Sequence, residues 1–227
     1  MADKKEIGQS TKSIWGGEME HELYERSTQV PVVHSVSFGY KDIDTWHKAA
    51  LGIVEGHIYS RNTNPTVRAF EDKIKELENA EAATSFSSGM AAISNTLGTF
   101  LKSGDRVVSI KDSYGGTNVI FNEFLPPLNI KVSLCDTNDH EQIKNEIAKG
   151  CQVLYLETPT NPTIKITDIK KLSAAAKEVG AIVVVDNTFA TPINQNPLEL
   201  GADITLHSAS KYLGGHADAL GGVICGN

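Results

Sequence analysis

The sequence lacks the features that mark several large classes of protein. No apolar run approaches the length that crosses a bilayer, and the opening MADKKEIGQS has no apolar core of the kind found in signal peptides. Cysteine is scarce: the 227 residues contain three, and no two of them form a C-x-x-C pair. We therefore expect a cytoplasmic protein with reduced thiols, without a disulfide framework, a zinc site or a membrane partner.

Positive charge is also in short supply. The chain has 21 Lys and Arg against 28 Asp and Glu, and its net charge is -7 with the two signs interspersed. Nothing resembles the basic stripe that binds a nucleic-acid backbone, and the seven histidines form no H-E-x-x-H or similar metal-binding spacing. The composition favours a small molecule as the bound partner, held in a locally positive pocket.

The pattern of apolar residues predicts an α/β protein. Residues 1–60 show no sustained period, and we interpret them as an N-terminal arm with connecting loops, followed by one domain over residues 61–227. A helix starting near Asn64 is predicted from apolar residues at steps of three and four, and others over Gly89 to Leu101 and Asp168 to Val179. Between helices lie short apolar runs, which predict a largely parallel sheet covered on both faces. These runs are Arg106 to Ile110, Ile130 to Cys135, Gln152 to Glu157, Ala181 to Asp186 and Asp203 to Ser208.

Three of the predicted strands end in a polar residue, namely Glu157, Asp186 and Ser208. Ligands of open α/β sheets bind beyond the carboxyl ends of the strands, so these side chains are expected to share one crevice. Each alone is more typical of a cap or turn residue. Together they favour a site.

The segment from His207 to His216 carries the strongest chemical signal. Ser208 and Ser210 are two residues apart, so in an extended backbone their hydroxyls share one side, with Lys211 beside them. Two hydroxyls and an amine suit a phosphorylated aldehyde, and partial desolvation would make the lysine a nucleophile. A surface lysine after a serine-rich turn explains the segment equally well.

Asp186 ends an apolar run, where a carboxylate needs a cationic partner or a donor. A protonated pyridine nitrogen meets that need in enzymes that use pyridoxal phosphate (PLP). The alternative, a dehydrogenase acid on a ribose, requires a G-x-G-x-x-G turn upstream, which the chain lacks, and the P-loop pattern is missing as well.

Three weaker signals accompany these. Ser87-Ser88-Gly89-Met90 opens a helix, where exposed N–H groups suit a phosphate. Tyr114 precedes two glycines and suits stacking on a flat ligand, although core packing is as good an explanation. Tyr59 and Arg61 suit a phosphate too, with a surface salt bridge as the alternative.

With these motifs, the chain resembles the Cys/Met-metabolism PLP enzymes: cystathionine γ-synthase, cystathionine γ-lyase, methionine γ-lyase and the O-acyl-homoserine sulfhydrylases. The resemblance covers nearly the whole chain from residue 59. Its stretches, in family order, are Tyr59-Ser60-Arg61 through Asn64-Pro65-Thr66, Ser87-Ser88-Gly89-Met90, Tyr114-Gly115-Gly116-Thr117, Glu157-Thr158-Pro159-Thr160-Asn161-Pro162, Val185-Asp186-Asn187-Thr188 and His207 to His216.

The resemblance implies the large domain of a fold-type-I PLP enzyme with an extended arm, the small C-terminal domain and its substrate-binding arginine lying beyond residue 227. It implies Lys211 and Tyr114 as catalytic residues, with Lys211 holding PLP as a Schiff base. It also implies a homodimer or homotetramer with shared active sites. The implied PLP-binding residues are Tyr59, Arg61, Gly89, Met90, Tyr114, Asn161, Asp186, Ser208, Ser210 and Lys211.

The implied activity is γ-elimination or γ-replacement on a sulfur-containing or O-acylated homoserine-type amino acid, in cysteine and methionine metabolism. Two positions depart from family patterns. Gly116 stands where methionine γ-lyases usually carry cysteine, and Ile58 stands where some cystathionine γ-lyases carry an acid. The choice of lyase, synthase or sulfhydrylase therefore stays open. A hypothesis of another class is a non-catalytic fragment or assembly partner.

Overall fold

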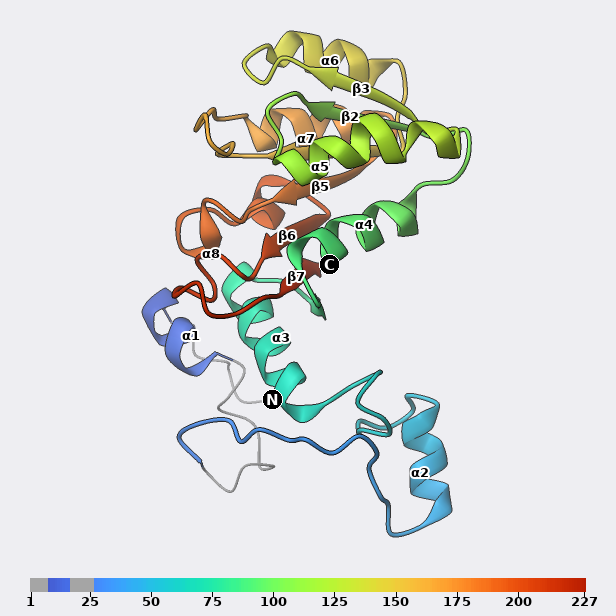
Figure 1. The fold of residues 1–227 in the computed structure, drawn as a ribbon, viewed down its shortest axis with the longest axis vertical. Helices are drawn as coiled ribbons and strands as arrows, with labels where there is room; N and C mark the ends of the chain where they lie inside the picture. Colours follow the sequence, from blue (N-terminus) through green and yellow to red (C-terminus); the bar gives the residue numbers. More distant parts are fainter. Residues whose placement is uncertain (1–7, 17–26) are drawn as a thin grey trace. The chain divides into compact units, whose positions relative to one another are not determined.

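The computed structural model describes residues 8–16 and 27–227. The chain divides into two compact units, residues 1–76 and 77–227, each of which is described by itself. The second unit contains a seven-stranded sheet in the order β1-β7-β6-β5-β4-β2-β3 (Figure 1). Its strands are β1 (Ala82–Phe86), β2 (Arg106–Ile110), β3 (Lys131–Cys135), β4 (Val153–Glu157), β5 (Ile182–Asp186), β6 (Ile204–Ser208) and β7 (Gly222–Gly226).

Five neighbouring strands, in the sheet order β3, β2, β4, β5 and β6, run parallel, as predicted. Strand β7 lies between β6 and β1 and is antiparallel to both. Helices join them. The helices of this unit are α4 (Gly89–Phe100), α5 (Gly115–Val119), η2 (Ile120–Phe124), η3 (Pro126–Leu128), α6 (His140–Ala148), α7 (Ile169–Glu178), α8 (Thr191–Asn194) and η4 (Pro197–Leu200).

Two apolar cores lie on the two faces of this sheet. One contains Val183 and Val185 of β5 with α6 and α7, and the other contains Val184 with α4 and η2. Successive residues of a strand point to opposite faces, so β5 contributes to both cores in turn. A strand buried on both faces has to be continuously apolar, which explains why the runs of branched residues predicted these strands correctly.

The first unit contains α1 (Gln9–Trp15), α2 (Ile43–Ala50) and most of α3 (Pro65–Glu78). The prediction for α3 is confirmed, and the Asn64 side chain accepts a hydrogen bond from Thr66 N (2.8 Å) at its start. The prediction that residues 1–60 are irregular is wrong for α1 and α2. Helix α2 buries only Ala49, its eight residues are too few to show a sustained apolar period, and its start is capped by Asp42.

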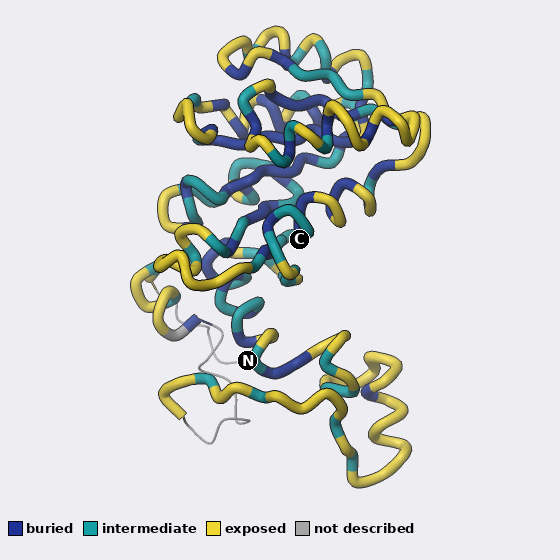
Figure 2. Tube along the Cα trace, in the orientation of Figure 1, coloured by how far each residue is buried: buried dark blue, intermediate teal, exposed yellow. Residues whose placement is uncertain are grey.

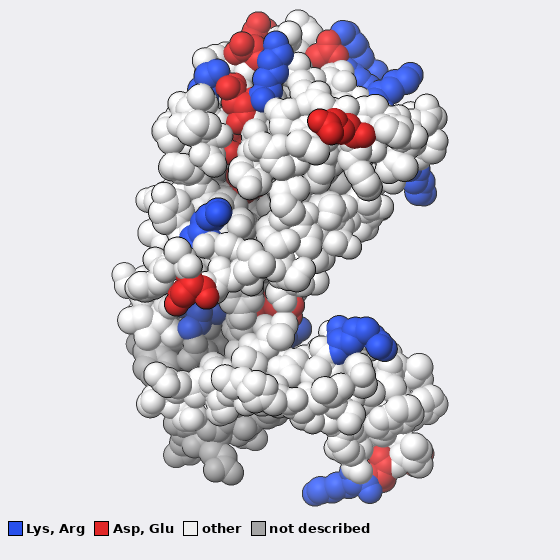
Figure 3. Space-filling view, in the orientation of Figure 1, with Lys and Arg blue, Asp and Glu red and all other residues white. Residues whose placement is uncertain are grey.

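Exposure differs between the units. Figure 2 shows buried strands in the second unit and mostly exposed backbone over residues 27–63 of the first. On the face drawn in Figure 3, acidic and basic side chains gather around α6, where Lys144 and Lys171 both pair with Glu141. No helix in the described ranges combines the length and the apolar character that a membrane span needs.

Candidate active site

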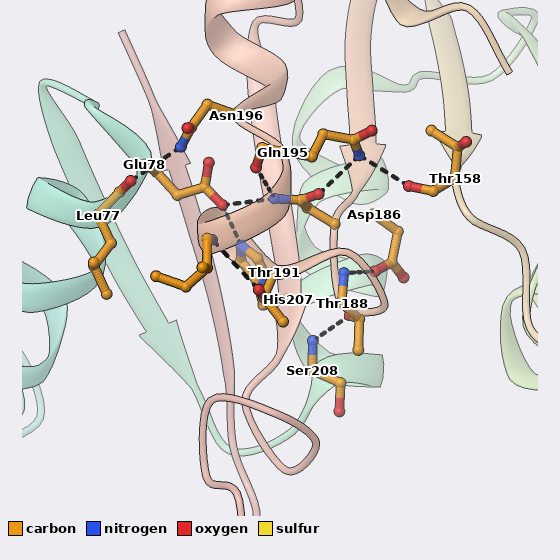
Figure 4. A network of polar contacts seen from close by, with 12 residues as sticks. Leu77, Glu78, Thr158, Asp186, Thr188, Thr191, Gln195, Asn196, His207 and Ser208 are labelled. Carbon is orange, nitrogen blue, oxygen red and sulfur yellow. Dashed lines mark hydrogen bonds and ion pairs between the residues drawn. The ribbon is translucent and has the colours of Figure 1, made fainter. Parts of the chain in front are cut away.

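The polar strand tips do lie along one edge of the sheet. Glu157 and Asp186 are paired directly across β4 and β5, and Asp186 is paired with Leu206, two residues before the end of β6. Ser208 N donates to the Thr188 hydroxyl (2.8 Å), and Thr188 N donates to the Asp186 carboxylate (3.0 Å; Figure 4). The parallel strands therefore bring these three tips together at their carboxyl ends, as predicted.

Asp186 is buried, and its carboxylate accepts hydrogen bonds from two sides. The Tyr155 hydroxyl donates to Oδ2 (3.2 Å), while Thr188 N donates to Oδ1. Burial raises the pKa of Asp186, and the Thr188 hydrogen bonds oppose that shift. Burial, then the Asp186 charge, raises the pKa of Tyr155 well above its usual value, so this hydroxyl stays a neutral donor.

Glu157 connects two loops that carry predicted site residues. Its Oε2 accepts from Tyr114 N (2.7 Å) and its Oε1 from Asn161 N (3.0 Å), so one carboxylate holds both backbones. Burial, followed by the charge of Asp186, raises the pKa of Glu157 to about 7, and the two N–H groups limit that shift. From the sequence, Glu157 was predicted to be a strand tip and part of a family motif, but no role was predicted for it.

The start of α4 packs directly against the end of β6. The Ser88 hydroxyl caps the helix by accepting from Ala91 N (3.1 Å). A Cβ added at Gly89 would lie 2.6 Å from Ser208 Cβ and 2.9 Å from Ser208 Oγ, so only glycine fits there. The first N–H groups of α4, those of Gly89 and Met90, have no partner within the helix. This end of α4 thus offers donors suited to an anion, beside the Ser208 hydroxyl.

The lysine loop differs from its prediction. Strand β6 ends at Ser208, and residues 209–214 form turns, so Ser208 and Ser210 do not share an extended backbone. The Ser210 hydroxyl instead accepts from Gly221 N (3.0 Å). Lys211 is exposed rather than partly desolvated. Within the described parts of the chain, its amine makes no hydrogen bond or ion pair and is free to react.

Tyr114 lies at the start of α5 and is 44% exposed, which argues against the core-packing explanation. Next to it, Gly116 is crowded. A Cβ added there would lie 2.7 Å from Met90 Sδ and 3.0 Å from Tyr114 Cε1. Met90, Tyr114 and Gly116 therefore form one packed group at this edge of the sheet.

Tyr59 and Arg61 belong to the first unit. Tyr59 pairs with Ser37 in an isolated antiparallel bridge, as an extended residue does, whereas Arg61 lies in the turn that follows, where Asn62 N and Thr63 N both donate to Tyr59 O. The two side chains are together, with the Arg61 guanidinium carbon 4.9 Å from the centre of the Tyr59 ring. Among the described residues Arg61 therefore makes a cation–ring contact and not the salt bridge of the alternative.

These residues fit PLP in charge and in shape. The buried Asp186 carboxylate suits a cationic ring nitrogen, and the glycine contact between α4 and β6 leaves backbone N–H groups accessible to a phosphate. The free Lys211 amine suits an aldehyde. No group of three or more His, Cys, Asp or Glu suited to a metal ion occurs in residues 8–16 and 27–227.

Known proteins similar to this chain belong to one family. A family model described as "Cys/Met metabolism PLP-dependent enzyme" matches residues 10–227. The chain is 41% identical over 223 residues to an L-methionine gamma-lyase of Fusobacterium nucleatum subsp. nucleatum, covering 98% of this chain and 56% of that protein. It is 45% identical over 190 residues to a cystathionine gamma-lyase of Bacillus subtilis, covering 84% and 50%.

The fold agrees as well. A crystal structure of cystathionine gamma-lyase from Lactobacillus plantarum, complexed with L-serine, superimposes with a TM-score of 0.87 at 36% identity. That alignment covers 97% of this chain and 55% of the other. The chain thus has the fold-type-I architecture and spans about half the length of the relatives that it matches.

Proposed function

This chain belongs to the Cys/Met metabolism PLP-dependent enzymes, and on that premise we propose that it serves γ-elimination or γ-replacement on a sulfur-containing or O-acylated homoserine-type amino acid. The reaction is of the cystathionine γ-lyase or γ-synthase kind. The observation that carries the proposal is the Asp186 carboxylate, buried at the tip of β5 beside the start of the lysine loop.

Each predicted residue receives a role in holding the cofactor. Asp186 is assigned to the pyridine nitrogen, and the Tyr155 and Thr188 donors orient its two oxygens. The phosphate is assigned to Gly89 and Met90 N–H with the hydroxyls of Ser208 and Ser210. Asn161 is assigned to the phenolic oxygen. PLP, when bound, supplies a ring that accepts the electron pair left at the substrate's α-carbon.

Two side chains are assigned to proton transfer. Lys211 Nζ, exposed and without a partner among the described residues, is assigned to hold the cofactor and, once released, to take the α-proton and return it. The Tyr114 hydroxyl is assigned to exchange a proton with the γ-leaving group. Glu157 sets the position of Tyr114 by accepting its backbone N–H.

The crowding at Gly116 supports the choice among family reactions. A cysteine there, as methionine γ-lyases usually carry, would place its Cβ against Met90 and the Tyr114 ring. The packed group would then have to shift. We therefore put cystathionine and acylated homoserines before methionine as substrates, with O-acyl-homoserine sulfhydrylase and methionine γ-lyase as the alternatives.

A homodimer or homotetramer is part of the proposal. The first unit exposes a series of large apolar side chains, which a second copy would cover. They include Val32 (67% exposed), Val36 (56%), Ile43 (72%), Leu51 (62%) and Ile53 (67%). Tyr59 and Arg61, in the same unit, are assigned to the phosphate of a neighbouring subunit.

Borohydride reduction tests the cofactor site. Purified protein loaded with PLP should show a visible absorption band, and reduction should trap the cofactor on the peptide containing Lys211. Lys211→Ala should lose the band and turnover of cystathionine, O-acylhomoserine and methionine alike, whereas Lys170→Ala, at another exposed lysine, should keep both. Turnover in Lys211→Ala would refute the proposal. Wild-type protein that carries PLP on Lys211 but turns over none of these substrates would favour the non-catalytic hypothesis.

A further inference from the structure

A second polar cluster lies beneath the strand tips and takes no part in the roles assigned above. Its centre is Glu78, the last residue of α3, whose side chain is completely buried. Glu78 Oε1 lies 2.5 Å from His207 Nε2 and accepts from Asn187 Nδ2 (2.9 Å). Figure 4 shows the Glu78 and His207 side chains pointing toward one another, joined by a dashed line. His207 and Asn187 are also fully buried.

The cluster occupies the opposite face of the sheet from Asp186. Leu206 belongs to the core on the α4 face, and it is the registered partner of Asp186. His207 is the next residue of β6, so its side chain points to the other face. Asn187 likewise follows Asp186, and its N–H continues the ladder by donating to Leu206 O (2.8 Å). The residues behind the sheet are thus the immediate neighbours of Asp186 and Ser208.

The network extends to the loop after β4. Asn187 Nδ2 donates to Gln195 O, and Gln195 Nε2 donates both to Asn187 Oδ1 and to Thr158 O, each at 2.9 Å. Thr158 directly follows Glu157. One connected set of side chains therefore fixes the ends of β4, β5 and β6 from behind, and these three ends carry Glu157, Asp186 and Ser208.

Stability alone does not account for this arrangement. A buried polar pair often contributes less than well-packed apolar side chains of the same volume, because both groups lose their hydration. The pair is also incompletely satisfied, since Glu78 Oε2 and His207 Nδ1 are buried and have no hydrogen-bond partner among the described residues. Apolar side chains would fill the space behind the sheet at less cost, but they would not fix the direction of the strand ends.

We propose that Glu78, His207, Asn187 and Gln195 form a positioning network that sets the geometry of Asp186 and Ser208 for the cofactor from the far face of the sheet. The inference rests on the proposed PLP site. These are positioning residues, since none of them is assigned a contact with cofactor or substrate.

The test compares His207→Leu with His207→Gln in purified PLP-loaded protein. Glutamine can place an N–H near the position of Nε2 and keep the bond to Glu78, whereas leucine removes the bond. We expect His207→Leu to weaken PLP binding about tenfold and to change the visible circular dichroism per bound PLP, with His207→Gln within about twofold of wild type. His140→Gln, at a half-buried histidine of α6, is the matched control and should change neither.

Thermal unfolding separates positioning from stability. If His207→Leu lowers the melting temperature but leaves PLP affinity and the visible dichroism unchanged below it, the network only stabilises the fold and the inference is wrong. Should His207→Leu fail to fold, Gln195→Ala decides, because it removes the hydrogen bonds from Gln195 Nε2 to Thr158 O and Asn187 Oδ1 and leaves the contact between Glu78 and His207. At least threefold weaker PLP binding supports the network, and unchanged binding refutes it. Failure of wild-type protein to bind PLP would instead overturn the proposed function.

Discussion

The surroundings of Glu157 make the stability of the PLP-free protein sensitive to pH. Its carboxyl group is buried next to Asp186, and this environment raises its pKa to about 7. A folded-state pKa above the unfolded value of about 4.3 means that the protonated form is favoured by folding. The stabilisation is present at low pH and is lost as the pH rises through about 7.

This predicts a pH-dependent difference between wild type and Glu157→Gln. In PLP-free protein, the free energy of unfolding of wild type should fall relative to that of Glu157→Gln by roughly 2–3 kcal/mol between about pH 5 and pH 8, because glutamine does not titrate. Urea denaturation at a series of pH values measures this. If the difference in unfolding free energy between wild type and Glu157→Gln stays constant across that range, the pKa of Glu157 is not raised.

Gly89 tests the close contact between α4 and β6. Gly89→Ala would put a Cβ 2.6 Å from Ser208 Cβ, so helix and strand must separate. We expect a loss of about 1–3 kcal/mol in unfolding free energy and weaker PLP binding. Gly98→Ala, in the same helix, is the control: nothing lies within 4 Å of its added Cβ, and alanine should stabilise the helix by about 0.5–1 kcal/mol. Equal effects of the two substitutions on PLP binding would refute the contact's role.

Among the elements, those with a repeating apolar pattern were predictable and those without one were not. Strands β4 and β5 are buried over nearly their whole length, and their runs of branched residues indicate this directly. Strands β1 (AATSF) and β7 (GVICG) were missed, since β1 has small and polar side chains and β7 begins and ends with glycine, so neither contains a comparable run of branched residues. The same distinction applies to the site residues. The positions of Asp186 and Ser208 were predictable because they end recognisable strands, whereas the role of Glu157 depends on two loop backbones that only the fold brings close to it.

Asp112 links three loops through its side-chain hydrogen bonds, and we call this set of contacts the tie. Asp112, after β2, accepts from the Thr137 hydroxyl (2.5 Å) after β3 and from Lys165 Nζ (2.9 Å) after β4. The Thr137 hydrogen bond, followed by that of Lys165, lowers the pKa of Asp112, so the stabilisation is present above the usual aspartate pKa and is lost as the pH falls through the lowered value. This tie holds the loop that carries Tyr114.

The tie should be measurable by a double-mutant cycle of Asp112→Asn and Lys165→Met. We expect a small stabilising coupling in the free energy of unfolding near neutral pH, since both side chains are partly exposed. Lys144→Met, which removes the more exposed pair with Glu141 on α6, should change the free energy of unfolding by less than this coupling. A coupling near zero would mean that the loops are held by other contacts.

At the scale of the whole molecule, the proposal divides the active site between two chains. Lys211, Asp186 and the start of α4 belong to the second unit, whereas Tyr59 and Arg61 belong to the first and are assigned to the phosphate of another copy. Exposed apolar side chains on the first unit provide the surface that such a partner would cover. A shared site makes catalysis dependent on assembly, which can be tested without a structure of the complex.

Mixing two inactive variants makes that test. In Arg61→Ala the lysine is intact, and in Lys211→Ala the arginine is intact, so a mixed dimer contains one complete site only if arginine acts across the interface. Random exchange of subunits makes half of the dimers mixed, and activity should therefore recover to about a quarter of the wild-type value. If Arg61 served its own chain, every site in the mixture would lack one of the two residues and no activity would return. Each variant unfolded and refolded alone is the control, and recovery there would point to contaminating wild-type enzyme.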